Sequence, residues 1–201
     1  MNFCESKTKE NLARAFISEV VDGARYQFMA KDAKSKGFGF LNKTFKQLAT
    51  NEMAHARVFY DFILNEGKSD CKCNGEGCEN IDVSVGLPYP NYMIPDSLKI
   101  SSVIEKHESA KIYKEFEIIA SEEGFEDVAK AFGHVVQVEN CHHLQLKELS
   151  EKMQQDKLYK MPKINKWKCT NCGTEIEGKQ APSPCPFCKY PQGFYMVPLS
   201  E

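Results

Sequence analysis

The sequence has no long apolar run and no large surplus of charge, and both absences narrow its function. No stretch of about 18 apolar residues is present, so we expect no membrane-spanning helix. The first ten residues lack the apolar core of a secretory signal, so we expect a soluble, cytoplasmic protein. The net charge of -2 gives no electrostatic reason to expect nucleic acid or an anionic membrane as a partner.

What the chain does contain is cysteine in an informative arrangement. Among its 201 residues are nine cysteines, of which four form two Cys-x-x-Cys pairs near the C-terminus. Without an export signal, such pairs are expected to be metal ligands rather than disulfides. A further group, Cys71, Cys73 and Cys78, has no fourth ligand nearby. Free thiols in a loop are favoured for this group over a third metal site, and the sequence does not define its role.

Apolar residues at steps of three and four predict four helices. They cover about 8–35, 45–62, 95–123 and 125–155. The connection at 65–97 is long and rich in turn residues, as in a crossover between helices of a bundle. We therefore predict a mainly α protein: a four-helix bundle at 1–155, a linker at 156–165 and a small cysteine-rich domain at 166–201.

Each predicted helix carries acidic side chains, and two also carry a histidine, within the apolar stripe. These residues are Glu19, Glu52, His55, Glu105, Glu108, Glu139 and His142. Burying unpaired carboxylates costs several kcal/mol each, and divalent cations remove that cost. The spacing Glu-x-x-His places both side chains on one helix face, and two such helices plus glutamates from the others form a di-iron carboxylate site. Carboxylate and imidazole ligands suit iron or manganese.

An internal repeat supports this set of residues. A shift of 87 residues places Tyr26 on Tyr113 and Glu52-x-x-His55 on Glu139-x-x-His142. The repeat slips at Glu19, which falls on Lys106, between Glu105 and Glu108. The helices therefore resemble a duplicated pair with one modified half. For Tyr26 and Tyr113, hydrogen bonding to ligand carboxylates and plain core packing both remain open.

The C-terminal cysteines have the spacing of a single-metal site. Cys169-x-x-Cys172 and Cys185-x-x-Cys188 each turn two sulfurs towards one ion, and the twelve residues between the pairs can form a short hairpin. Four thiolates bind zinc as a structural ion or iron as a one-electron centre. The spacing does not select between them.

Taken together, these motifs resemble the rubrerythrin family over essentially the whole chain. They are Glu19 with Tyr26, Glu52-x-x-His55, Glu105-x-x-Glu108 with Tyr113, Glu139-x-x-His142, Trp167-x-Cys169-x-x-Cys172 and Cys185-Pro186-x-Cys188. The resemblance implies a ferritin-like di-iron domain followed by a rubredoxin-like domain. The cysteine cluster within 65–97 departs from the family pattern.

The resemblance also implies an activity. Rubrerythrins reduce hydrogen peroxide to water at the di-iron site, in defence against oxidative stress. Their electrons pass through the rubredoxin-like iron from rubredoxin or an NAD(P)H-dependent reductase. A head-to-tail homodimer is expected on the same ground.

Residue roles are implied in the same way. Glu52 and Glu139 resemble the bridging carboxylates, Glu19 and Glu105 the terminal ligands, and His142 the permanent imidazole ligand. The family exchanges a glutamate for a histidine at the other iron on reduction, which implies Glu108 and His55 here.

Two alternatives stay open. One is a ferritin-like ferroxidase or iron-handling protein whose tail is a structural zinc site. The other is a sensor whose cysteine loop responds to oxidation. The metal loaded in the cell, the electron donor and the preferred oxidant are not specified by the sequence.

Overall fold

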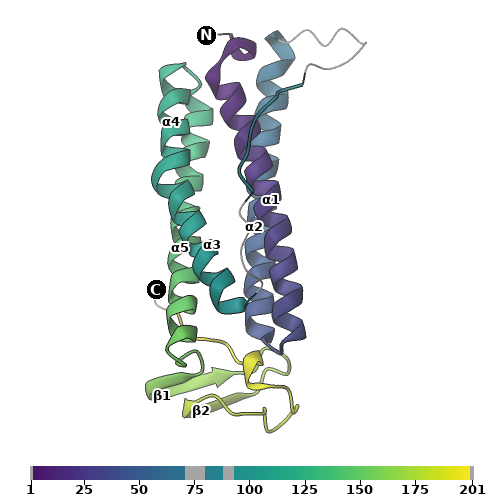
Figure 1. Cartoon of the computed structure of the whole chain (residues 1–201), viewed down its shortest axis with the longest axis vertical. Coiled ribbons are helices and arrows are strands. Elements are labelled where there is room, and N and C mark those ends of the chain that lie inside the picture. Colours follow the sequence, from purple (N-terminus) through teal and green to yellow (C-terminus); the bar gives the residue numbers. More distant parts are fainter. Residues whose placement is uncertain (1, 71–79, 88–92, 200–201) are drawn as a thin grey trace. The chain divides into compact units, whose positions relative to one another are not determined.

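The computed structural model describes residues 2–70, 80–87 and 93–199, so Cys71, Cys73 and Cys78 lie outside the described residues. The elements follow the order seen in Figure 1. They are α1 (Lys7–Ser35), α2 (Gly39–Asp70), α3 (Ile94–His107), α4 (Tyr113–Glu122), α5 (Glu126–Gln154), β1 (Lys160–Lys168) and β2 (Glu175–Gln180). Short 3-10 turns occupy Phe3–Glu5 and Gln192–Phe194. Within the described ranges, no helix has the length and apolarity needed to cross a membrane.

The mainly α prediction is confirmed, and the repeat is visible in how two helical runs end. Gly37 and Gly124 both have positive φ, 81° and 87°, a conformation that glycine adopts without a steric penalty. After each glycine, the next amide donates back to the helix, Phe38 N to Ala33 O and Phe125 N to Ala120 O. Both ends are therefore glycine-dependent Schellman caps.

The third predicted helix is not a single α-helix. A π-helical segment, Glu108–Ile112, separates α3 from α4. Such a segment accommodates one extra residue in an α-helix, often at a functional site. One extra residue also accounts for the slipped repeat, because Glu19 and Glu105 are 86 residues apart whereas Tyr26 and Tyr113 are 87 apart. The break in the repeat is thus a local insertion in the second half.

Two compact units divide the helices, and each packs side chains of four helical runs around its own core. The first unit contains residues 1–24, 50–89 and 104–142, with Leu12, Phe59, Phe116 and Phe132 in its core. The second contains 25–49, 90–103 and 143–201, with Tyr26, Phe45, Leu98 and Leu146 in its core. Burial of these apolar side chains is the main contribution to helix packing.

The C-terminal module is a two-stranded antiparallel sheet with the cysteine loops beside it. Trp167 pairs with Ile176 across the strands, is fully buried, and donates its indole N–H to Gly178 O at 3.0 Å. β1 begins at Lys160, so part of the segment predicted as a linker belongs to the sheet. The domain limits themselves stay a prediction.

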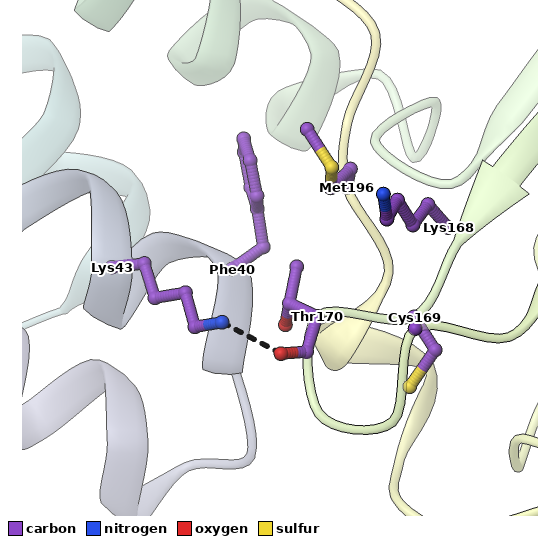
Figure 2. Close-up of a pocket in the computed structure, with 7 residues that line it drawn as sticks. Phe40, Lys43, Lys168, Cys169, Thr170 and Met196 are labelled. Carbon is purple, nitrogen blue, oxygen red and sulfur yellow. Dashed lines mark hydrogen bonds between the residues drawn. The ribbon is translucent and has the colours of Figure 1, made fainter.

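Close backbone contacts attach this module to the turn between α1 and α2, inside the second unit. A Cβ at Gly193 would lie 2.2 Å from Gly37 O, and a Cβ at Gly39 would lie 2.3 Å from the Phe194 ring. Lys43 Nζ donates to Thr170 O at 2.6 Å, next to a pocket of about 350 Å³ (Figure 2). The first cysteine loop is therefore supported by α2.

Candidate metal centres

Four helical elements bring acidic and imidazole side chains together in the first unit. The side chains that meet are Glu19 from α1, Glu52 and His55 from α2, Glu105 from α3, and Glu139 and His142 from α5. They form two groups of four, within each of which one ligand atom per residue lies within 4.8 Å of the others. All four glutamates are at most 3% exposed. Burying this many carboxylates is costly unless positive charge accompanies them.

The first group surrounds His55 Nδ1. Three carboxylate oxygens lie close to this nitrogen: Glu139 Oε1 at 3.0 Å, Glu52 Oε2 at 3.1 Å and Glu19 Oε2 at 3.3 Å. A single ring N–H cannot donate well to three acceptors at once. Four donor atoms that converge in this way fit the coordination of one ion.

The second group surrounds His142 Nδ1, with Glu139 Oε2 at 2.9 Å, Glu52 Oε1 at 3.2 Å and Glu105 Oε2 at 3.8 Å. The other ring nitrogen, Nε2, lies 3.1 Å from Asn51 Nδ2, which orients the imidazole. Glu52 and Glu139 each direct one oxygen to either group. This is the arrangement expected of carboxylates that bridge two ions.

Glu108 lies outside both groups. Its Oε1 accepts a hydrogen bond from Ser18 Oγ at 3.1 Å. Six of the seven residues proposed as ligands are therefore brought together in the groups, while Glu108 is held by α1. The assignment of individual ligands remains a prediction.

The two tyrosines differ in their surroundings. Tyr113 donates its hydroxyl to Glu19 Oε1 and is buried. The ring of Tyr26 stacks on Phe45 in the core of the second unit, with a centroid distance of 6.2 Å. Tyr113 thus contacts a proposed ligand directly, and Tyr26 contributes to packing.

Burial shifts the pKa values of several of these groups. Burial raises the pKa of Glu105 to about 7, and it raises the pKa values of Glu19 and Glu108 well above their usual range. Burial disfavours a charged His55, but the close carboxylates of Glu139, Glu19 and Glu52 outweigh it and raise its pKa to about 12.

Buried carboxylate oxygens that lack a hydrogen bond show whether a metal ion fits this site. Within the described residues, both carboxylate oxygens of Glu52 and Oε1 of Glu139 are buried without a hydrogen bond of full geometry. Buried acceptors of this kind are rare and costly. The donor set of carboxylates and imidazoles matches iron. The residues fit a pair of iron ions.

The second centre is formed by four cysteine sulfurs. Cys169 Sγ lies 3.8 Å from Cys188 Sγ, and Cys172 Sγ lies 3.9 Å from Cys185 Sγ. A tetrahedron with metal–sulfur bonds of about 2.3 Å has edges of about 3.8 Å, so the sulfurs are spaced for one ion. This geometry fits iron and zinc equally.

Hydrogen bonds to the sulfurs distinguish the cysteines. Burial raises the pKa of Cys169 to about 11, although the amides of Cys172 and Asn171 oppose the shift. The hydroxyl of Tyr195, followed by the amide of Cys188, lowers the pKa of Cys185 to about 6.

Sequence reasoning missed several polar groups at these centres, among them Ser18 and Asn51. Asp22 is buried one turn after Glu19 on α1, and its charge helps to raise the pKa of Glu108 after the larger effect of burial. Its spacing of three residues from Glu19 is a signal that was available. Thr174 and Tyr195 supply hydroxyls to the cysteine site, and nothing in a Cys-x-x-Cys motif points to them.

Fold and sites together define a class: a ferritin-like di-iron carboxylate protein joined to a rubredoxin-like four-cysteine module. Among solved structures, nigerythrin in a mixed-valence state has a TM-score of 0.59 at 21% identity, covering 98% of this chain and 93% of its own. The bacterioferritin of Desulfovibrio desulfuricans has a TM-score of 0.61 at 20% identity, covering 75% of this chain and 82% of its own. At these identities the likeness shows the fold.

Sequence comparison then gives the family. Residues 10–150 match the Rubrerythrin family model, and residues 167–195 match the model of the rubrerythrin rubredoxin-like domain. Rubrerythrin of Clostridium perfringens is 33% identical over 195 residues, covering 96% of this chain and 94% of that protein. Rubrerythrin of Nitratidesulfovibrio vulgaris is 28% identical over 193 residues, covering 94% and 93%. The chain belongs to the rubrerythrin family, which implies an oxidoreductase.

Proposed function

We propose that the protein is an NADH-linked peroxidase that reduces hydrogen peroxide to water at its di-iron site. Electrons reach that site one at a time through the four-cysteine iron centre. The observation that carries the proposal is the sharing of Glu52 and Glu139 between two ligand groups, in a chain that also has a one-metal sulfur site. A pair of ferrous ions supplies the two electrons needed to split one O–O bond.

The side chains of this chain have distinct tasks in the proposal. Glu52 and Glu139 would hold both ions, because each directs one oxygen to either group. Tyr113 fixes the orientation of the Glu19 carboxylate through its hydroxyl. The aromatic rings of Phe59, Tyr113 and Phe132, with centroids about 5–6 Å apart, exclude bulk water from the same unit.

His55 and Glu108 are proposed to alternate as ligands of one ion. His55 lies among three carboxylates, while Glu108 is held by Ser18. A neutral imidazole suits the lower charge of a ferrous ion, and a carboxylate suits the ferric ion. We therefore expect His55 to be the ligand in the reduced enzyme and Glu108 to be the ligand in the oxidised enzyme.

The proposed partners are hydrogen peroxide, a redox donor protein such as rubredoxin or an NAD(P)H-dependent reductase, and a second copy of the chain in a homodimer. The choice of these partners rests on family membership and on the presence of the four-cysteine site.

The test uses the iron-loaded full chain, reduced without oxygen and mixed rapidly with hydrogen peroxide. We expect the di-iron site to reoxidise faster than free Fe(II) at the same concentration and pH, with two iron ions oxidised per peroxide. A rate no faster than that of free Fe(II) would refute the proposal.

The alternative is a ferritin-like ferroxidase whose tail is a structural zinc site, and it is favoured by the bacterioferritin fold alone. Metal analysis separates the two functions. Zinc in the four-cysteine site, together with faster oxidation by oxygen than by peroxide and retention of the oxidised iron, supports the ferroxidase.

A further inference from the structure

Two side-chain hydroxyls lie at the four-cysteine site, one beside each cysteine loop. Thr174 Oγ1 is 3.2 Å from Cys172 Sγ. Tyr195 packs in the same buried cluster as Cys185 of the second loop. Both belong to the second unit, as do all four cysteines.

Tyr195 is held by the first loop but reaches the second. It forms an isolated antiparallel bridge with Cys169, and its neighbours add the hydrogen bonds Thr170 N to Phe194 O and Met196 N to Lys168 O. The side chain is fully buried. Its position is therefore fixed by backbone pairing rather than by the hydroxyl.

The backbone pairing leaves the buried hydroxyl of Tyr195 without an acceptor of its own, since it meets none at full hydrogen-bond geometry among the described residues. Cys185 belongs to the same buried cluster, and Tyr195 is the largest influence that lowers the pKa of its thiol. A buried phenol needs a partner, and a metal-bound thiolate is a charged acceptor for it.

Thr174 is placed by the turn of the first loop. Gly173 takes a positive φ of 78°, and Cys169 N donates to Thr174 O at 2.9 Å. The turn holds the threonine hydroxyl against Cys172 Sγ. Once Cys172 is a thiolate, the hydroxyl is the donor and the sulfur is the acceptor.

We propose that Tyr195 and Thr174 raise the reduction potential of the four-cysteine iron centre by donating O–H hydrogen bonds to Cys185 and Cys172. Reduction of Fe(III) to Fe(II) adds one electron, and the added negative charge spreads onto the sulfurs. Donors to sulfur stabilise the more negative, reduced state more than the oxidised state. Amide donors reach Cys169 and Cys185 as well, so the two hydroxyls add to a backbone contribution.

The experiment is a redox titration of the iron-loaded full chain, followed through the visible thiolate-to-iron absorption. Tyr195→Phe and Thr174→Val each remove one hydroxyl and keep most of the side-chain volume. At a fixed ambient potential, each change is expected to lower the ratio of reduced to oxidised centre by roughly threefold to tenfold, where tenfold corresponds to about 59 mV for one electron.

Matched variants separate this role from packing. Thr174→Ser keeps a hydroxyl and is expected to restore the wild-type potential. Tyr190→Phe removes a phenol of the same module that is 43% exposed, and the potential is expected to stay unchanged. The readout is independent of peroxide turnover, so the proposal and the peroxidase function can fail separately.

Unchanged potentials in both Tyr195→Phe and Thr174→Val overturn the proposal. An equal drop in Thr174→Ser and Thr174→Val also counts against it, because the loss would then come from packing. If Tyr195→Phe binds no iron, the Thr174 pair decides alone, and an unchanged potential in Thr174→Val overturns the proposal.

Discussion

The two metal centres of this chain are built in opposite ways. The proposed di-iron ligands come from four helical elements, and Glu19 and Glu139 are 120 residues apart in the sequence. The sulfur ligands come from two short loops whose own amides donate to the sulfurs. The first site concentrates buried charge that needs metal ions, while the second is organised by local turns. The two centres should therefore respond separately to mutation and to metal removal.

The largest expected effect comes from loss of a bridging carboxylate. Glu52→Gln keeps the side-chain shape but removes the charge shared by both ions. Replacing a group that only supports a ligand costs about 10–100-fold, so we expect at least about a 100-fold loss of peroxide reactivity here. Metal analysis and rapid mixing measure it. The visible absorption of the sulfur site should persist, and exposed Glu115→Gln on α4 is the control.

Cys188→Ser removes a ligand of the four-cysteine centre and leaves the di-iron site intact. It is expected to abolish the visible thiolate-to-iron absorption and to reduce NADH-driven turnover to background, because electron delivery is lost. A single turnover with chemically reduced protein should remain, since the di-iron ligands are untouched. Cys141→Ser, at an exposed cysteine on α5, should leave both measurements unchanged. Loss of the single turnover as well would show that the centres are not separable.

In the metal-free protein, the free energy of unfolding should fall as pH rises from about 5 to 9. The pKa of Glu105 is raised to about 7 in the folded state, so its ionisation above that pH costs on the order of 3 kcal/mol, which disappears below its unfolded pKa. His55 and His142 act in the same direction. Their pKa values are raised to about 12, so their stabilisation is complete below about 6.5 and is lost as pH rises towards 12.

Thermal unfolding of metal-free and iron-loaded protein across this pH range provides the measurement. Glu105→Gln should flatten the profile of the metal-free protein, because it removes the ionisable group. A metal-free profile that rises with pH would contradict the assigned electrostatics.

The smallest effect is expected from Tyr113→Phe. Its hydroxyl orients Glu19 Oε1, so its removal should weaken iron binding or peroxide reactivity about tenfold. The ring remains in the core, and the fold should be kept. Tyr26→Phe is the matched change at the repeat-related position, and its effect is measured in the same way. Equal effects would mean that both tyrosines support the site.

Local pattern predicted most of this structure, and contacts between distant segments account for the rest. Both Cys-x-x-Cys pairs converge because each pair is a self-contained loop. The helical carboxylates required the internal repeat, since no single Glu-x-x-His identifies a site. The separate environment of Glu108 was not predictable, because it depends on Ser18 from α1. The role of Tyr195 was not predictable for the same reason, because the residue pairs its backbone with one cysteine loop and acts through its side chain on the other.

The π-helical segment at Glu108–Ile112 marks where the two halves of the duplicated helix pair differ in length. A duplicated helix pair starts with two equivalent halves and therefore with two equivalent metal positions. One inserted residue in α3–α4 ends that symmetry without disturbing the shared glycine-capped turns at Gly37 and Gly124. Aligned on Glu19 and Glu105, Glu108 corresponds to Asp22, so both halves keep a pair of carboxylates and the insertion follows that pair in the second half. A single insertion is thus a short route from a symmetric ion-binding bundle to one whose two metal positions differ.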